Sequence, residues 1–335
     1  MALGAIQRMD KSTLCIDTDK AYNSGYLNQA TLRGPDMLPS VVAKAGFFAL
    51  WHPEVMVLVI ILGFTYRQLV GPLRSRFGPN LPPFPRMRRL AMYLSLVTLY
   101  IAVGTPLQIL ADQFLLTAHM IQFVLLAMVL PPLFLIGLPD WLIAPLLRPH
   151  SVMAAIKFFT RPGVALLAFT VVFSIFQVPN LLEATLKYNG LYLVEEYLMM
   201  LASIFLWWPV YSPTKAIPSI ARPLTLLYLF AMSLPTLLTF AFITLAGQAF
   251  YSTFITGAHA LGVSPLTDQQ LGGAVMKVST MLILLVVFIK EFYMWVQAER
   301  AKEAAISIPN RQARNPNYRP SHLTMIKGKK RDSGT

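Results

Sequence analysis

Side chains that can bind metal ions recur near one end of several long apolar stretches of this sequence. They supply imidazole, carboxylate and thioether groups, and some of them share a helical face, as Glu195 and Met199 do at a spacing of four residues. This mixture of donors suits a soft or borderline metal, copper before zinc. The candidate ligands are His52, His119, Met120, Glu195, Glu196, Met199, Asp268 and Met276.

Each candidate also has an ordinary structural explanation. Methionine is a common filler of apolar helices, and this chain has 16 of them. His119 has the alternative role of a hydrogen-bonded residue that bridges two helices. Lys277 is an alternative partner for Glu195 or Glu196, because a paired charge inside a membrane costs less than a lone one. The residues alone leave these alternatives open beside the metal site.

The apolar stretches that carry these side chains have the length of membrane-spanning helices. Each approaches, alone or with its flanks, the roughly 20 residues that cross the hydrocarbon core of a bilayer. The chain as a whole is 56% hydrophobic and only 13% charged. We therefore predict an all-α, polytopic membrane protein with a bundle of seven transmembrane helices. The predicted spans are 47–66, 90–106, 114–137, 163–179, 190–209, 223–247 and 272–296.

Lys and Arg residues are concentrated on alternate connections between these spans. The connections 67–89, 138–162 and 210–222, together with the tail from Lys290, hold 21 of the 28 Lys and Arg residues in the chain. The intervening connections contribute only Lys187. Because cytosolic loops carry the excess of positive charge, this pattern predicts an external N-terminus and a cytosolic C-terminus. It also places the candidate ligands near the non-cytosolic surface.

The domain organisation follows from the same pattern. Residues 1–46 form a polar external segment, predicted to be partly disordered, with no cleavable signal peptide and one thiol, Cys15, that cannot form an internal disulfide. Residues 47–296 form the transmembrane domain, and 297–335 a basic cytosolic tail predicted to be disordered. The net charge of +13 lies mostly beside the spans. It therefore favours contact with lipid headgroups over nucleic acid.

Prolines interrupt two of the predicted helices. Pro131 and Pro132 fall inside the third span, so that helix should kink or end near Leu130. Pro235 interrupts the sixth span in the same way. The neighbouring hydroxyls can take up backbone groups that the proline leaves without a partner; they belong to Ser233, Thr236 and Thr239.

Three motifs together resemble the CtaG-type cytochrome c oxidase assembly factors. The run ThrAlaHisMetIleGln that opens 117–137, with its later Pro-Pro and Gly, resembles the third-helix signature of that family. GluGluTyr at 195–197 with TrpTrpProVal at 207–210 resembles its fifth-helix pattern. AspGlnGlnLeuGlyGly at 268–273, followed by Met276, resembles the opening of a late helix.

The resemblance implies a non-enzymatic assembly factor for haem–copper oxidases in the bacterial cytoplasmic membrane, with copper as a possible ligand. Its implied partners are cytochrome c oxidase subunits or other copper chaperones. His119 corresponds to the first histidine of the third-helix motif, and Asp268 to the late acidic position. Phe123 and Tyr197 stand where the family often has histidine, and Lys277 where tryptophan is expected.

Two other classes of protein are compatible with the topology. A small-solute or metal transporter needs a polar path across the bilayer, whereas the inner halves of these spans are apolar. A seven-helix sensory protein would use Lys277 for a Schiff base, with Glu195 or Glu196 as counter-ion. The motifs of common catalytic sites are absent from the sequence, so we predict that the chain is not an enzyme.

Overall fold

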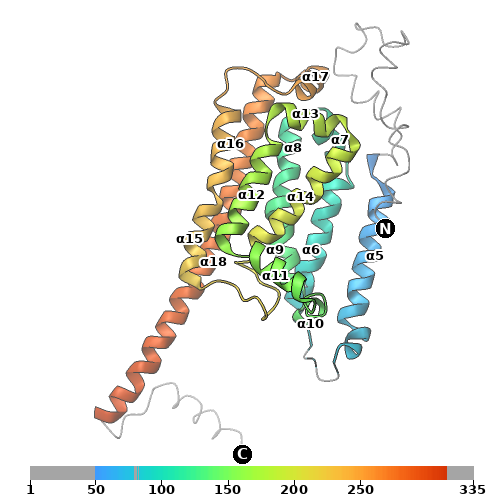
Figure 1. Cartoon of the computed structure of the whole chain (residues 1–335). Coiled ribbons are helices and arrows are strands. Elements are labelled where there is room, and N and C mark those ends of the chain that lie inside the picture. Colours follow the sequence, from blue (N-terminus) through green and yellow to red (C-terminus); the bar gives the residue numbers. More distant parts are fainter. Residues whose placement is uncertain (1–49, 79–80, 82, 315–335) are drawn as a thin grey trace, which may run out of the picture.

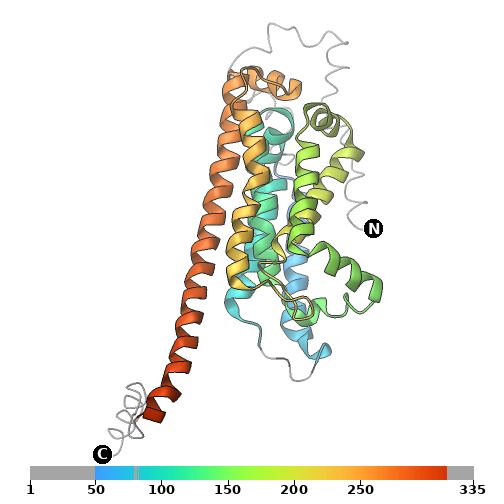
Figure 2. The same ribbon diagram turned by 60° about the vertical axis from the view of Figure 1, so that its left-hand side comes forward.

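The computed structural model describes residues 50–78, 81 and 83–314, and the predicted external segment with Cys15 lies outside them. Within these residues all regular secondary structure is helical, with no strand. The helices stand roughly side by side in a bundle (Figures 1 and 2). In chain order they are α5 (Pro53–Val70), η1 (Pro72–Arg76), α6 (Arg86–Val103), α7 (Leu107–Gln113), α8 (Leu116–Phe123), η2 (Val124–Val129), α9 (Leu130–Gly137), α10 (Asp140–Ile143), α11 (His150–Phe159), α12 (Pro162–Phe176), α13 (Pro179–Lys187), α14 (Asn189–Trp207), α15 (Arg222–Met232), α16 (Leu234–Thr244), α17 (Ser252–Ala260) and α18 (Pro265–Arg314).

The described helices include five that are long and apolar enough to cross a membrane, or up to seven if each of two bent pairs forms one span. The bent pairs are α6 with α7, at 48°, and α11 with α12, at 76°. This confirms the predicted all-α membrane fold with several spans, whereas the orientation stays a prediction. The last helix does not stop at the predicted boundary of residue 296, because α18 continues to Arg314.

The third span changes its helical geometry where its two prolines begin. A π-helical turn, η2, precedes α9, and Pro131 and Pro132 lie in the first turn of α9. The carbonyl of Ala127 would normally accept a hydrogen bond from the N–H of residue 131 in an α-helix, or of residue 132 in a π-helix. Both of these residues are prolines and have no N–H, so the helix itself offers this carbonyl no donor. The Trp207 indole Nε1 donates to this carbonyl instead, at 3.1 Å. The helix therefore continues past Leu130, and the freed carbonyl joins it to α14.

Trp207→Phe should lower the free energy of unfolding in detergent by about 1–3 kcal/mol, because it leaves the buried Ala127 carbonyl without a donor. Trp208→Phe is the matched control, since the Trp208 Nε1 has no hydrogen-bond partner among the residues that the structure describes. Thermal unfolding of the two purified variants measures the difference. Equal melting temperatures would contradict a structural role for the indole of Trp207.

A second freed carbonyl explains one of the polar side chains inside the spans. Pro106 has no N–H to offer the carbonyl of Ala102, which lies four residues earlier at the bend between α6 and α7. The buried Gln122 side chain donates Nε2 to this carbonyl at 3.0 Å. Gln122 therefore holds the bend in α6–α7 against α8.

The sixth span is divided into α15 and α16 at Pro235. The Ser233 hydroxyl donates to the Phe230 carbonyl at 2.8 Å, and the Thr236 hydroxyl donates to the Ser233 carbonyl at 3.1 Å. Two of the three predicted hydroxyls thus bond the backbone at the break.

The aromatic centre of the core joins three spans. The Phe123 and Phe173 rings lie 4.8 Å apart between centroids, and Trp207 is fully buried in the same core. Phe123, which stands where the family often has histidine, is therefore a packing residue. At the other end of the third span, the Tyr66 hydroxyl donates to the Gly137 carbonyl at 2.7 Å.

Candidate functional site

The short helices α7, α13 and α17 lie at one end of the bundle, and α10 and α11 lie at the opposite end (Figure 1). The candidate ligands on α8, α14 and α18 lie toward the first of these ends, because these helices directly follow α7, α13 and α17 in the chain. We call this end the outer polar layer: the short helices α7, α13 and α17 with His52 before α5 and the parts of α8, α14 and α18 that carry the candidate ligands. It corresponds to the surface that the cation pattern predicts to be non-cytosolic. The positions of its side chains decide which of the predicted ligands can act together.

Asp268 binds the start of α8. Its Oδ2 accepts the Leu116 backbone N–H at 2.7 Å, and its Oδ1 accepts that of Thr117 at 3.2 Å. The Thr117 hydroxyl returns a bond to the Asp268 carbonyl at 3.0 Å. The first N–H groups of a helix lack partners within it, so this carboxylate caps α8 from another helix. Both oxygens of the predicted ligand are thus engaged by the backbone.

The next residues of the same motif tie α18 to α16. The Gln269 Nε2 donates to the carbonyls of Ile243, at 3.1 Å, and Gln248, at 3.2 Å, and its Oε1 accepts the Phe250 N–H at 2.9 Å. Gly272 lets α18 approach α8 closely, because an added Cβ would lie 3.1 Å from the Leu116 backbone. The motif 268–273 therefore acts as a structural clamp between helices.

The helix α17 covers the start of α8. The Ser252 backbone N–H is bound by the Glu183 carboxylate of α13. Tyr251, just before α17, donates its hydroxyl to the Gln177 carbonyl at 3.0 Å, and burial raises the pKa of this phenol, so it stays protonated. Gly257 packs closely against the turn before α8, because a Cβ added at this glycine would lie 2.4 Å from Phe114 Cα. These contacts fix α17 against the start of α8.

His119 lies on α8 beneath this cover. Its Nδ1 is buried and has no hydrogen-bond partner among the described residues. The ring lies 5.8 Å from the Phe254 ring of α17, measured between centroids, and it also contacts the backbone of Ala111. A nitrogen in this position is available to a ligand that enters the layer.

The three candidate methionines belong to the hydrophobic core. Met120 and Met276 are fully buried, and Met199 is partly buried against the same core. These positions agree with the packing alternative for thioether side chains. Met199 lies one turn beyond Glu195 on α14 and is the one of the three with partial exposure.

The two glutamates join an acidic group that the sequence analysis did not find. Glu195, Glu196 and Asp112 of α7 all lie within electrostatic range of the Tyr192 hydroxyl, which accepts a bond from the Gln108 Nε2 at 3.4 Å. Glu195 Oε2 is buried without a hydrogen-bond partner in the described part of the chain. Two signals could have found this group: Asp112 is the only acid of its connection, and Tyr192 precedes the glutamates by one helical turn.

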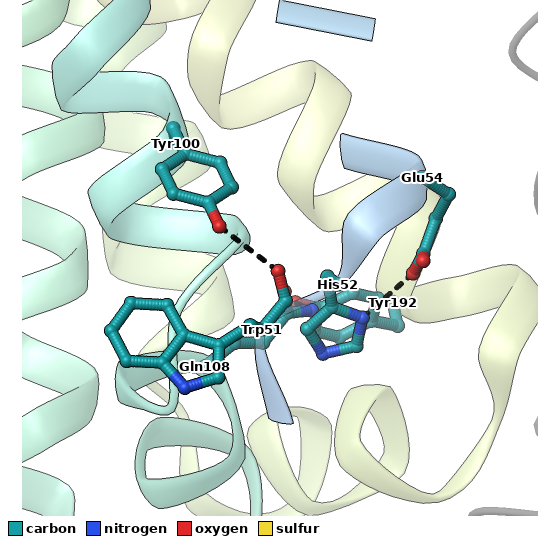
Figure 3. A network of polar contacts seen from close by, with 6 residues as sticks. All are labelled: Trp51, His52, Glu54, Tyr100, Gln108 and Tyr192. Carbon is teal, nitrogen blue, oxygen red and sulfur yellow. Dashed lines mark hydrogen bonds and ion pairs between the residues drawn. The ribbon is translucent and has the colours of Figure 1, made fainter. Parts of the chain in front are cut away.

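His52 lies at the start of α5 and forms a hydrogen bond with a neighbouring carboxylate. Its Nδ1 lies 2.8 Å from Glu54 Oε1, and Figure 3 shows the ring turned toward that carboxylate. The backbone of His52 has a positive φ of 37°. Its Nε2 is buried and has no hydrogen-bond partner within the described ranges. The neighbouring Trp51 carbonyl accepts the Tyr100 hydroxyl at 3.0 Å, which ties α5 to α6.

Lys277 does not neutralise the glutamates. Its Nζ donates to the Ser233 carbonyl at 2.9 Å, at the break between α15 and α16. Lys277 makes no ion pair with Glu195 or Glu196, both of which the structure describes. The predicted alternative of a Lys–Glu pair is wrong, because α18 packs against α15 and α16 whereas the glutamates lie on α14. Neither glutamate is therefore placed to serve Lys277 as the counter-ion that a Schiff-base lysine would need.

The fold and the outer polar layer define a multi-pass helical membrane protein with buried imidazole and carboxylate groups at one end. Over the residues described, no group of three or more His, Cys, Asp or Glu side chains is arranged to hold a metal ion. The family model of the cytochrome c oxidase caa3 assembly factors matches residues 64–298. The chain belongs to this family, which confirms the resemblance seen in its motifs. No curated protein and no solved structure matches the chain significantly.

Proposed function

We propose that this chain is a non-enzymatic assembly factor that acts on a cytochrome c oxidase from the non-cytosolic face of a bacterial cytoplasmic membrane. Membership of the caa3 assembly factor family supports the oxidase as client. The distribution of Lys and Arg supports the orientation. The partners are then oxidase subunits, or copper chaperones that supply them.

We further propose that Cu(I) is a cargo handled in the outer polar layer. The observation that carries this proposal is that His119 Nδ1, Glu195 Oε2 and His52 Nε2 are buried without hydrogen-bond partners in the described part of the chain. Buried polar atoms in proteins are nearly always bonded, so such atoms have capacity for a further partner, either a water or a bound ion. Imidazole and thioether groups are suitable ligands for copper.

The same layer favours passage of the ion over permanent binding. Asp268 is occupied as a helix cap, and Met120 and Met276 are enclosed by the core. His52, His119, Glu195 and the partly exposed Met199 remain as donors, and over the described residues no three His, Cys, Asp or Glu side chains are arranged to hold a metal ion. An ion that these donors coordinate incompletely can leave again, which suits a cargo that must pass to the oxidase.

One complementation experiment tests both parts of the proposal. Deleting the gene in its native host should lower the haem–copper oxidase absorbance and the copper content of isolated oxidase. The wild-type chain should restore both, and so should His150→Ala, because His150 is exposed at the opposite end of the bundle. His119→Ala should fail to restore the copper content, because it removes the buried nitrogen.

The outcomes separate the two parts. Normal oxidase in the deletion strain would contradict the assembly role itself. Full copper in oxidase from the His119→Ala strain, with the deletion defective, would keep the assembly role and contradict copper handling at His119. The membrane level of each variant, measured by immunoblot, shows whether the chain is still made and inserted.

A further inference from the structure

The helix α11 departs from the direction of the spanning helices. Its axis is bent by 76° from that of α12, and Figure 2 shows it projecting sideways near the end opposite to the outer polar layer. The bend has a local cause, because Pro162 disfavours helical geometry at the preceding residue, and Arg161 is extended at φ −63°, ψ 131°. Since α12 lies along the bundle, α11 lies closer to the plane of the membrane.

The side chains of α11 divide between the protein and its surroundings. Ile156 packs against the hydrophobic core, and the Phe159 ring stacks on Phe205 of α14 with centroids 5.5 Å apart. Phe158 is 49% exposed and Val152 is 38% exposed, and no residue of α11 is fully buried. Apolar side chains that leave the bundle at its rim are at the right height to enter the boundary between headgroups and acyl chains.

The charge on this segment has one sign. No acidic residue occurs between positions 141 and 182, whereas Arg148, Lys157 and Arg161 all lie on α11 or at its ends. Lys157 is exposed, and the Arg161 guanidinium lies 5.8 Å from the centre of the Phe158 ring. Cations beside exposed aromatic side chains are typical of helices that lie on an anionic membrane surface.

We propose that α11 is an interfacial helix that binds anionic phospholipid headgroups through Arg148, Lys157 and Arg161 while Val152 and Phe158 enter the acyl region. Its partner is a membrane surface rich in lipids such as phosphatidylglycerol. The helix thereby fixes the depth of α12 and α14 in the bilayer. This proposal is independent of copper handling at the opposite end.

Fluorescence quenching by brominated lipids tests this proposal on the full chain. The only cysteine, Cys15, is replaced by serine, and an environment-sensitive fluorophore is attached at Val152→Cys. The chain is reconstituted in mixed vesicles in which either phosphatidylglycerol or phosphatidylcholine carries the bromine. We expect stronger quenching by brominated phosphatidylglycerol. Lys157→Gln should reduce that preference about fivefold, which corresponds to ~1 kcal/mol per cation near a charged surface, and the charge reversal Lys157→Glu should reduce it further.

Lys187→Glu is the matched control, because Lys187 is an exposed cation at the end of α13, and α13 lies at the opposite end of the bundle from α11 (Figure 1). It should leave the preference at residue 152 unchanged. Absence of quenching by either lipid would overturn the proposal, since α11 would then lie outside the membrane. Equal quenching by both lipids, with no response to Lys157→Glu, would also overturn it. If Lys157→Glu does not fold, the neutral variant Lys157→Gln gives the same comparison with a smaller change.

Discussion

Gly137→Ala should lower the free energy of unfolding by about 3 kcal/mol, the upper end of the cost of overpacking a closely packed core. A Cβ at Gly137 would lie 2.7 Å from the Met92 Cβ and 2.8 Å from the Met92 backbone. Neither atom can move away without displacing α6, because Met92 lies in the middle of that helix. The contact between α6 and α9 would therefore open. Thermal unfolding of the purified variant in detergent measures the loss.

The matched control is Gly163→Ala, where an added Cβ would meet no atom within 4 Å. Gly163 lies in the first turn of α12, so alanine should be neutral or should stabilise the chain by up to about 1 kcal/mol through its higher helix propensity. Similar melting temperatures for the two variants would contradict the close approach of α6 and α9.

Asp268→Ala should lower the free energy of unfolding by about 2–5 kcal/mol, because it leaves the buried N–H of Leu116 and the partly buried N–H of Thr117 without acceptors. Asp268→Asn should have a smaller effect, since its amide oxygen can still accept one of the two bonds. Hydrogen exchange at the amides of Leu116 and Thr117 should become faster in both variants. This local readout distinguishes a lost cap from general destabilisation.

Asp140→Ala provides the control for the cap. Asp140 Oδ1 also accepts a backbone N–H, from Lys215 at 3.3 Å, but this bond is exposed to solvent. Its removal should change the free energy of unfolding by less than about 1 kcal/mol. If Asp268→Ala lost copper yet melted like Asp140→Ala, Asp268 would be a metal ligand and its role as a cap would be contradicted.

The sequence predicted the membrane helices because their signals are local. Apolar length marks each span, and the prolines mark where the third and sixth spans change, as η2 and the α15–α16 break confirm. The sequence also predicted that polar side chains gather toward one end, since residues at equal distances from the ends of spans lie at equal depths. Family membership followed from motifs that are each contained within one segment.

Only the tertiary structure decided what individual polar side chains do. Asp268 meets Leu116 across 152 positions of sequence, and Lys277 meets Ser233 across 44. Helical spacing reveals neighbours on one helix and gives no information on which helix packs beside it. The sequence offered Asp268 as a ligand, and the structure shows that it caps α8, while its binding of a metal stays a prediction. The apolar pattern predicted the position of each side chain along its span, whereas its bonding partner depended on the rotation and packing of whole helices.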